Sequence, residues 1–324
     1  MKRNSIGETG LTLSELGFGA APVGNLFSEV SDEVAAGAIA QAWRSGVRYF
    51  DTAPHYGLGL SERRLGEALA AHDRDEFVLS TKVGRLLRHN PRPGGSDLAT
   101  GGFAVTDDLT RVLDYSGDGV KRSIGESLER LDLDRVDIVY VHDPDDHVDQ
   151  VIDETFPALI ELRDQGVVSA IGAGMNFWQP LLQFVQRCDI DVVMLAGRWT
   201  LLDRSGLPLL DACAQRSVSV VSAAPFNSGI LSHAKPQRDD HYNYERVPSE
   251  LFERATALAA ICENYGTTLP YAAIQFPLRH AAVGSVVAGM RTEAQARTDA
   301  EWMSAELPEE LWDELERFDG AGRS

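Results

Sequence analysis

Eight short apolar runs that recur along the whole chain constrain its fold more than any other feature. Each run is rich in Val, Ile and Leu, which is typical of strands buried on both faces. The predicted strands are Leu16–Ala21, Tyr49–Ala53, Phe77–Val83, Val136–His142, Val168–Ala173, Val192–Ala196, Val218–Ala223 and Val283–Ala288. Strands of this kind predict a parallel sheet in the middle of the molecule.

Helix-like windows separate these runs, and parallel neighbours need such crossover helices. The windows are Asp32–Arg44, Ser61–Ala71, Val120–Arg130, Val148–Gln165, Gln179–Arg187, Leu207–Arg216, Pro248–Tyr265, Glu293–Met303 and a last one at Pro308–Phe318. Residues 4–14 alternate around a glycine, which predicts a small β-hairpin ahead of the first run. Because eight strand–helix pairs close a barrel, we expect one α/β domain over residues 1–324. Its predicted fold is a (β/α)8 TIM barrel with an N-terminal β-hairpin and a C-terminal extra helix.

The alternative is an open doubly wound sheet, which normally carries a glycine-rich turn after its first strand. Residues 17–22 read Gly-Phe-Gly-Ala-Ala-Pro, which approaches that turn. However, Pro22 stands where the third glycine belongs, and proline has no backbone N–H to offer a pyrophosphate. The pattern therefore favours the closed barrel.

The composition excludes several classes of partner. Thirty Lys and Arg against 49 Asp and Glu give a formal net charge of −19, and so acidic a surface repels nucleic acid and anionic lipid. The sequence has no apolar stretch of the roughly 18 residues that would span a bilayer. Cys188, Cys213 and Cys262 are too scattered for a disulfide framework or a zinc pattern. We expect a soluble cytoplasmic protein without nucleic-acid or membrane partners, and the sequence leaves its oligomeric state open.

Two stretches superficially resemble metal sites: residues 142–147, His-Asp-Pro-Asp-Asp-His, and residues 239–241, Asp-Asp-His. Pro144 prevents a helix that could align the first set, and adjacent side chains of an extended segment point to opposite sides. We interpret both stretches as solvated loops and predict no metal.

Polar side chains follow three consecutive predicted strands. Asp51 and Tyr56 lie at the end of the second strand, Lys82 at the end of the third and His142 at the end of the fourth. Alone, each of these residues is most often a solvated or paired polar group. Together they would project into one mouth, the face where barrel enzymes carry their chemistry. The two unusually long connections, 84–118 and 232–247, lie on the same face.

Such a set suits proton transfer through a phenol. Free tyrosine has a pKa near 10, and a nearby ammonium stabilises the phenolate and lowers that pKa. A carboxylate paired with the lysine keeps the ammonium charged, and an imidazole can donate a hydrogen bond to a substrate oxygen. None of these groups carries a hydride, so a redox reaction would need a nicotinamide.

The run Phe50-Asp51-Thr52-Ala53-Pro54-His55-Tyr56-Gly57, with Ser61-Glu62 after it, resembles the second-strand signature of the aldo-keto reductases. Thr81-Lys82-Val83 and Val141-His142 are similar to that family's lysine and histidine strands, and further similarity extends to Gly289 and Arg291. The resemblance implies that Tyr56 is the general acid/base, that Lys82 and Asp51 tune it, and that His142 orients the substrate oxygen.

Within that family, residues 54–62, 171–176 and 195–203 are similar to a sugar-oxidising branch. This branch includes D-threo-aldose 1-dehydrogenases (L-fucose dehydrogenases), plant L-galactose dehydrogenase and bacterial pyridoxal 4-dehydrogenase. The resemblance implies NAD(P)-dependent oxidation of an aldose, of the L-fucose, D-arabinose or L-galactose type, at C1 to the lactone. The alternatives are pyridoxal oxidation, general aldehyde reduction, or a non-catalytic NADP-binding regulatory subunit, against which the intact catalytic set argues.

The resemblance also implies that NAD or NADP lies across the barrel mouth. The implied contacts are Asn176, Trp199, Pro225, Phe226, Gly229, Gly289, Arg291, Thr292, Gln295 and Asp299. Trp199 either stacks on the nicotinamide or is a core aromatic residue. Within residues 289–295 only Arg291 offers a charge to a 2′-phosphate, whereas Glu293 and Asp299 would oppose one, so NAD is favoured.

Overall fold

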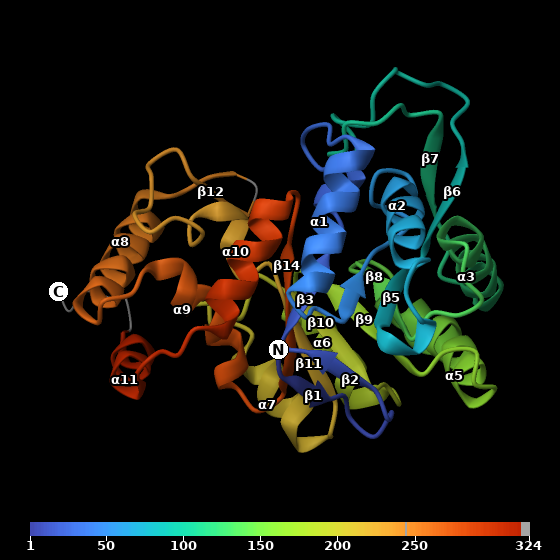
Figure 1. Ribbon diagram of the computed structural model, residues 1–324. Helices are drawn as coiled ribbons and strands as arrows, with labels where there is room; N and C mark the ends of the chain where they lie inside the picture. Colours follow the sequence, from blue (N-terminus) through green and yellow to red (C-terminus); the bar gives the residue numbers. More distant parts are fainter. Residues whose placement is uncertain (244, 319–324) are drawn as a thin grey trace.

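The computed structural model describes residues 1–243 and 245–318. Eight parallel strands close into a barrel in the order β3–β4–β5–β8–β9–β10–β11–β14 (Figure 1). Their bounds are β3 Leu16–Gly19, β4 Tyr49–Asp51, β5 Val78–Val83, β8 Ile138–His142, β9 Ala170–Met175, β10 Val192–Ala196, β11 Ser219–Ala223 and β14 Val283–Gly289. Each lies in one of the predicted runs, to within two residues at its carboxyl end. The predicted barrel is therefore confirmed.

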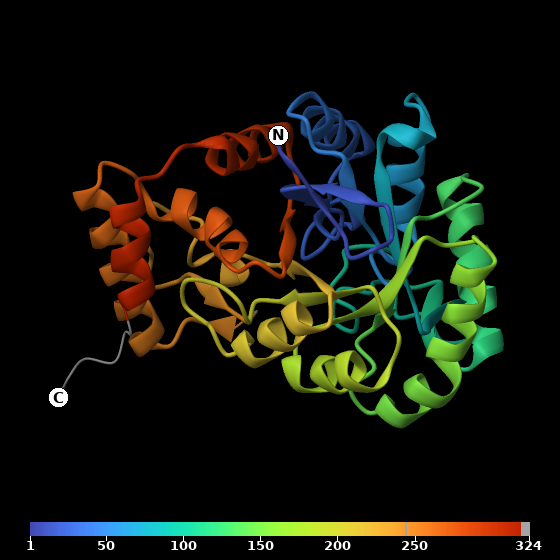
Figure 2. The same ribbon diagram turned by 90° about the horizontal axis from the view of Figure 1, so that it is seen from below.

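Helices surround the barrel (Figure 2). Their bounds are α1 Asp32–Arg44, α2 Leu60–Leu69, α3 Gly117–Leu131, α4 Val148–Gln150, α5 Phe156–Asp164, α6 Trp178–Arg187, α7 Leu207–Gln215, α8 Ser249–Asn264, α9 Leu269–Gln275, α10 Glu293–Ser304 and α11 Glu309–Arg317. A π-helical turn at Val151–Thr155 joins α4 to α5, so the window predicted there is helical throughout. Short 3-10 turns lie at Pro22–Gly24, Arg74–Glu76, Asn227–Gly229 and Phe276–Arg279.

One barrel helix differs from the expectation. Between β11 and β14 the sequence predicts a single helix, but the structure has both α8 and α9. The shorter α9 packs against β14 and α10, whereas α8 packs on α9 and on α11, outside the barrel (Figure 1). Most of α9 is buried, including Leu269, Pro270 and Ile274, so it lacks the polar face that marks an amphipathic helix in a sequence.

The N-terminal hairpin pairs β1, Arg3–Ser5, with β2, Thr12–Ser14, as predicted. Its Ile6 and Leu13 are fully buried and pack with the inward-facing Tyr49 and Tyr140 of the barrel. The hairpin therefore closes the amino end of the barrel, and the opposite end remains for chemistry.

Tight packing around the barrel depends on two glycines. A Cβ on Gly172 of β9 would lie 1.6 Å from the Val192 carbonyl oxygen of β10. A Cβ on Gly66 of α2 would lie 2.0 Å from the Leu131 carbonyl oxygen, so this glycine lets α2 approach α3. Any side chain at either position would force the neighbouring backbone apart.

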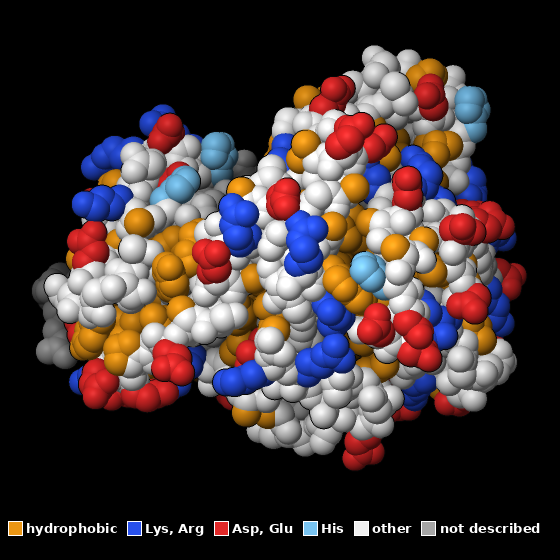
Figure 3. All heavy atoms as spheres, viewed as in Figure 1, with side chains coloured by type: hydrophobic (Ala, Val, Ile, Leu, Met, Phe, Trp, Pro, Cys, Tyr) orange, Lys and Arg blue, Asp and Glu red, His pale blue; other side chains and the backbone are white. Residues whose placement is uncertain are grey.

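Both long connections contain strands the sequence did not reveal. The first holds the antiparallel pair β6, Arg85–His89, and β7, Leu109–Leu113. The second holds β12, His241–Tyr242, and β13, Glu245–Arg246. Figure 3 shows a notch at the upper edge of the molecule between these two regions, above the barrel. Among the described residues, no helix is both long and apolar enough to cross a membrane.

Candidate active site

Adjacent strands bring the predicted site residues together at the carboxyl end of the barrel. Asp51 is the last residue of β4, Lys82 lies near the end of β5, and His142 is the last residue of β8. Strand β5 pairs with β4 on one side and with β8 on the other. Tyr56 lies in the loop that leads from β4 to α2. The strand order thus gathers residues that are up to 91 positions apart, as from Asp51 to His142.

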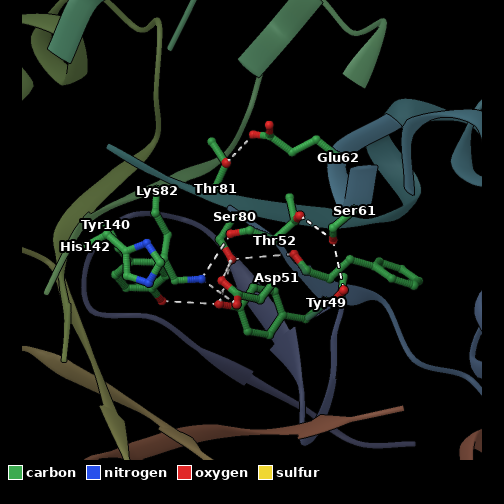
Figure 4. A network of polar contacts seen from close by, with 12 residues as sticks. Tyr49, Asp51, Thr52, Ser61, Glu62, Ser80, Thr81, Lys82, Tyr140 and His142 are labelled. Atoms are coloured by element: carbon green, nitrogen blue, oxygen red, sulfur yellow. Dashed lines mark hydrogen bonds and ion pairs between the residues drawn. The ribbon is translucent and has the colours of Figure 1, made fainter. Parts of the chain in front are cut away.

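A buried ion pair forms the base of the site. The Lys82 Nζ lies 2.6 Å from Asp51 Oδ2, and each residue is 2 % exposed (Figure 4). Lys82 also donates to the Thr52 carbonyl at 3.0 Å, and the Ser80 hydroxyl donates to Asp51 Oδ1 at 2.7 Å. Burial is the largest single effect on the pKa of Lys82 and lowers it, but Asp51 and Tyr56 together outweigh burial and leave this pKa raised. The lysine is therefore a charged ammonium at neutral pH.

The phenol of Tyr56 lies beside this ammonium. Lys82 Nζ is 4.8 Å from the centre of the Tyr56 ring and interacts with the hydroxyl. Desolvation raises the pKa of Tyr56 to about 12, which outweighs the lowering by Lys82. Lys82 does lower the pKa of Tyr56, as expected, but desolvation is the larger effect, so the net pKa stays above its ordinary value. Tyr56 is accordingly a protonated phenol at neutral pH.

His142 is a neutral hydrogen-bonding group. Its ring lies 5.8 Å from the Tyr56 ring, centre to centre, at 88°. Burial lowers the pKa of His142 well below the usual value, and the positive charges of Arg85 and Lys82 lower it further. The Nδ1 atom of His142 is buried without a hydrogen-bond partner in the described part of the chain. A buried polar atom of this kind calls for a partner, and a bound substrate can supply one.

Glu62, which belongs to the motif quoted above, supports the lysine strand through contacts that the sequence alone does not predict. Glu62 of α2 is fully buried and accepts hydrogen bonds from Thr81 at 2.8 Å and from Arg130 at 2.5 Å. Thr81 precedes Lys82, so this contact anchors the lysine strand to α2 (Figure 4). The sequence alone does not distinguish a buried glutamate such as Glu62 from one on the surface. Only its position directly after the tyrosine loop could have signalled a role.

The first implied cofactor segment follows strands β9 and β11. Asn176 is exposed just beyond β9. After β11, Pro225 is buried, Phe226 packs edge-on against Trp302, and Gly229 has a φ of 121°. The buried Asn227 side chain shapes this loop, since it accepts from Thr200 at 2.6 Å and donates to the Gly197 carbonyl at 3.0 Å. Sequence reasoning missed Asn227.

The second implied cofactor segment begins where Gly289 ends β14. Thr292 caps α10 by accepting from the Gln295 backbone N–H, and the Gln295 side chain accepts from the Arg291 backbone N–H. The Arg291 guanidinium donates to the Ser28 hydroxyl and to a backbone carbonyl at Leu26.

Further along α10, Asp299 is 5 % exposed, and burial raises its pKa to about 7. The segment that begins at Gly289 follows the carboxyl end of β14, the same end of the barrel as Asp51, Lys82 and His142.

Trp199 has a different environment. It is 7 % exposed, packs on Phe276 at 5.4 Å between ring centres, and donates from its indole to the Pro277 carbonyl at 3.2 Å. These contacts favour the second of its two interpretations, a core aromatic residue, because a ring that stacks on a nicotinamide needs an open face.

Comparisons with known proteins agree with this geometry. Residues 15–319 match the model of the aldo/keto reductase family. The chain is 49 % identical over 310 residues to a D-threo-aldose 1-dehydrogenase from Pseudomonas sp., covering 94 % of both chains. It is 37 % identical to a pyridoxal 4-dehydrogenase from Microbacterium luteolum, covering 97 % of this chain and 96 % of the relative.

Among solved structures, the holo form of an aldo-keto reductase from Bacillus halodurans superposes with a TM-score of 0.78 at 25 % identity, covering 98 % and 96 % of the two chains. The family and branch inferred from the sequence motifs are thereby confirmed, and so is the expectation of an enzyme. The chain belongs to the aldo/keto reductase family and is an NAD(P)-dependent oxidoreductase.

Proposed function

We propose that the enzyme oxidises an aldose at C1 to the corresponding lactone and that NAD is its cofactor. The observation that carries this proposal is the convergence of the buried Asp51–Lys82 pair, the Tyr56 phenol and the neutral His142 at one mouth. The 49 % identity to a D-threo-aldose 1-dehydrogenase supports the substrate class.

In this proposal each catalytic residue has one task. Tyr56, as the phenolate, takes the proton of the anomeric hydroxyl while the C1–O bond gains carbonyl character. The Lys82 ammonium, held by Asp51, stabilises the phenolate that this step requires. His142, neutral at working pH, donates a hydrogen bond to the reacting oxygen. A bound nicotinamide would supply the acceptor for the hydride that leaves C1.

The same residues serve the reverse reaction. A phenol whose pKa is about 12 is protonated over the whole physiological range, so it is ready to give its proton to an aldehyde oxygen. Oxidation instead requires that proton to leave Tyr56 first. The site therefore supports both directions, with opposite dependences on pH.

The residues at the second cofactor segment support NAD over NADP. Arg291 is the cation of residues 289–299 closest to the end of β14, and its guanidinium is already engaged by Ser28 and by Leu26. Two carboxyl groups lie nearby: Glu293, which pairs with Arg44, and Asp299, whose pKa is raised by burial to about 7. An additional 2′-phosphate would thus meet acidic groups and a cation whose hydrogen bonds are already used. Asn176, Pro225, Phe226, Gly229, Gly289, Thr292 and Gln295 complete the proposed cofactor contacts.

A substrate panel tests this function. The enzyme is assayed with L-fucose, D-arabinose, L-galactose and pyridoxal, each with NAD and with NADP, by the absorbance of the reduced cofactor. We expect sugar oxidation with the higher kcat/KM for NAD. Pyridoxal as the preferred substrate would instead support the alternative suggested by the 37 % identical relative. Turnover of neither class would contradict the proposal.

A further inference from the structure

The residue immediately before the catalytic tyrosine, His55, has an environment that proton transfer by Tyr56 does not explain. Its ring lies 5.5 Å from the His142 ring and 6.0 Å from the Tyr56 ring, centre to centre. Phe103, from the β6–β7 connection, packs edge-on against it at 5.3 Å. His55 remains partly exposed, so it belongs to the wall of the mouth rather than to the core.

An arginine fixes the protonation state of this imidazole. Arg111 of β7 donates from Nε to His55 Nδ1 and from Nη2 to the His55 carbonyl oxygen at 2.9 Å. Because a guanidinium only donates, His55 Nδ1 must accept and the ring's one proton must be on Nε2. Desolvation and the charge of Arg111 together lower the pKa of His55 to about 2, so the ring stays neutral.

The arginine is itself held in place. Asp97 accepts two hydrogen bonds from the Arg111 guanidinium, at 2.6 and 2.7 Å, and is 2 % exposed. A Cβ on Gly101 would lie 2.3 Å from Asp97 Oδ2 and 2.4 Å from Arg111 Nη1, so only glycine leaves room for this pair. The β6–β7 connection is thus built around a paired guanidinium that points at His55.

Among the described residues, the hydrogen bonds of His55 involve its Nδ1 and its carbonyl oxygen, and its Nε2–H donates to none of them. A neutral imidazole N–H at the wall of the mouth suits an uncharged oxygen, and a sugar carries several hydroxyl groups besides the one that reacts. The residues that surround the ring, Phe103, Tyr56 and His142, offer it no carboxylate.

We propose that His55 orients the sugar by donating from Nε2 to a hydroxyl oxygen other than the one at C1, and that Arg111 is the positioning residue that keeps this donor available. The inference rests on the proposed aldose substrate. It makes the β6–β7 connection, through the Asp97–Arg111 pair, part of sugar selection.

The first test compares a sugar with an aldehyde that has no hydroxyl groups. The variants His55→Leu and His55→Gln are assayed for oxidation of the preferred sugar with NAD and for reduction of propanal with NADH. Loss of one hydrogen bond to substrate predicts that His55→Leu lowers the ratio of sugar kcat/KM to propanal kcat/KM about tenfold, mainly through the KM of the sugar. His55→Gln retains an N–H donor and should recover part of the ratio.

Monodeoxy analogues of the sugar identify the contacted hydroxyl. On the analogue that lacks this hydroxyl, His55→Leu should have the same kcat/KM as the unchanged enzyme.

The second test addresses Arg111. In Arg111→Met, His55 loses the donor at Nδ1 and one of the charges that lower its pKa, although desolvation, Arg85 and Lys82 still lower it. The neutral ring can then carry its proton on Nδ1 instead of Nε2, so the KM for the sugar should rise at neutral pH and fall again at acidic pH, where the imidazolium donates from both nitrogens. Arg88→Met is the matched control, because Arg88 lies on the same hairpin but pairs with Glu126 of α3. It should leave the KM and its pH profile unchanged. A merely structural role of Arg111 would lower stability without creating a new pH dependence.

The outcomes separate this inference from the proposed function. If the unchanged enzyme oxidises no sugar, both fail. If it oxidises a sugar but His55→Leu keeps the sugar-to-propanal ratio, or if Arg111→Met creates no pH dependence in the KM for the sugar, the inference fails and the aldose function stands.

Discussion

The Asp51–Lys82 pair offers the sharpest test of how the site is held together. The change is Asp51→Asn, which keeps the size and shape of the side chain but removes its negative charge. The ammonium of Lys82, 2 % exposed, would then retain only neutral acceptors, including the Thr52 carbonyl at 3.0 Å. Both charges of the native pair lie in a region where water cannot replace a missing partner.

The expected magnitude follows from that burial. Removing one partner of a buried ion pair typically costs about 3–5 kcal/mol, because the other charge remains uncompensated. Asparagine still accepts one hydrogen bond, so we expect Asp51→Asn to lower the free energy of unfolding by about 3 kcal/mol, at the lower end of that range. Lys82→Met alone leaves the carboxylate with the Ser80 hydroxyl and should cost a similar amount. The double variant buries no unpaired charge. Its loss in the free energy of unfolding should therefore be roughly 2 kcal/mol smaller than the sum of the losses in the two single variants.

Urea denaturation at pH 7, followed by tryptophan fluorescence and by circular dichroism, measures all three variants. Glu161→Gln is the control, because Glu161 pairs with Lys121 at 3.1 Å on the surface, with the two side chains 62 % and 51 % exposed. That change should alter stability by less than about 1 kcal/mol. Additive effects of Asp51→Asn and Lys82→Met, within about 0.5 kcal/mol, would refute the idea that the two charges depend on each other.

Three further predictions concern packing, pH and thiol reactivity. Gly66→Ala should lower the free energy of unfolding in urea by about 1–3 kcal/mol, because its Cβ would meet the α3 backbone. The control Gly125→Ala, which has open space around its Cβ, should raise that free energy by about 0.5–1 kcal/mol. Equal effects of the two changes would contradict the close approach of α2 to α3. The kcat/KM for sugar oxidation should rise from pH 7 to pH 10, whereas the kcat/KM for aldehyde reduction should not. The reason is that Tyr56, with a pKa of about 12, must lose its proton only for oxidation. Parallel pH profiles for the two directions would contradict the role of Tyr56 in proton transfer. Burial raises the pKa of Cys213 and Cys262 to about 12, so iodoacetamide at pH 8 should leave both thiols of the native enzyme unmodified. Peptide mapping after the reaction measures this, and rapid labelling would contradict their burial.

The barrel and the convergence of the candidate site residues at its mouth could be predicted because their signals are local. Each strand is a short apolar run, and Asp51, Lys82 and His142 lie at or next to the ends of strands that neighbour one another in the closed order. A barrel of parallel strands then places all these ends at one mouth. Helix α9 was not predicted, because it is buried on most sides and therefore lacks the periodic alternation of apolar and polar residues that marks a surface helix.

Contacts between distant segments could not be predicted. Arg111 is 56 residues from His55, and Glu62 is 68 residues from Arg130, so nothing in the local sequence pairs them. Predicting the sign of the Tyr56 pKa shift likewise requires knowledge of contacts between distant segments. The sequence shows that a lysine is near the tyrosine, but the extent of desolvation, which dominates the shift, depends on how the whole mouth folds.

The most direct test of the catalytic assignment is the turnover of Tyr56→Phe, which removes the phenolic proton and little else. We expect kcat for the preferred sugar to fall roughly 10²–10⁴-fold, the usual contribution of general acid–base catalysis, while the Kd for NAD, measured by fluorescence titration, changes little. Tyr271→Phe, a substitution in α9 outside the site, should keep kcat unchanged. Wild-type turnover in Tyr56→Phe would contradict the assignment of Tyr56 as the group that moves the proton.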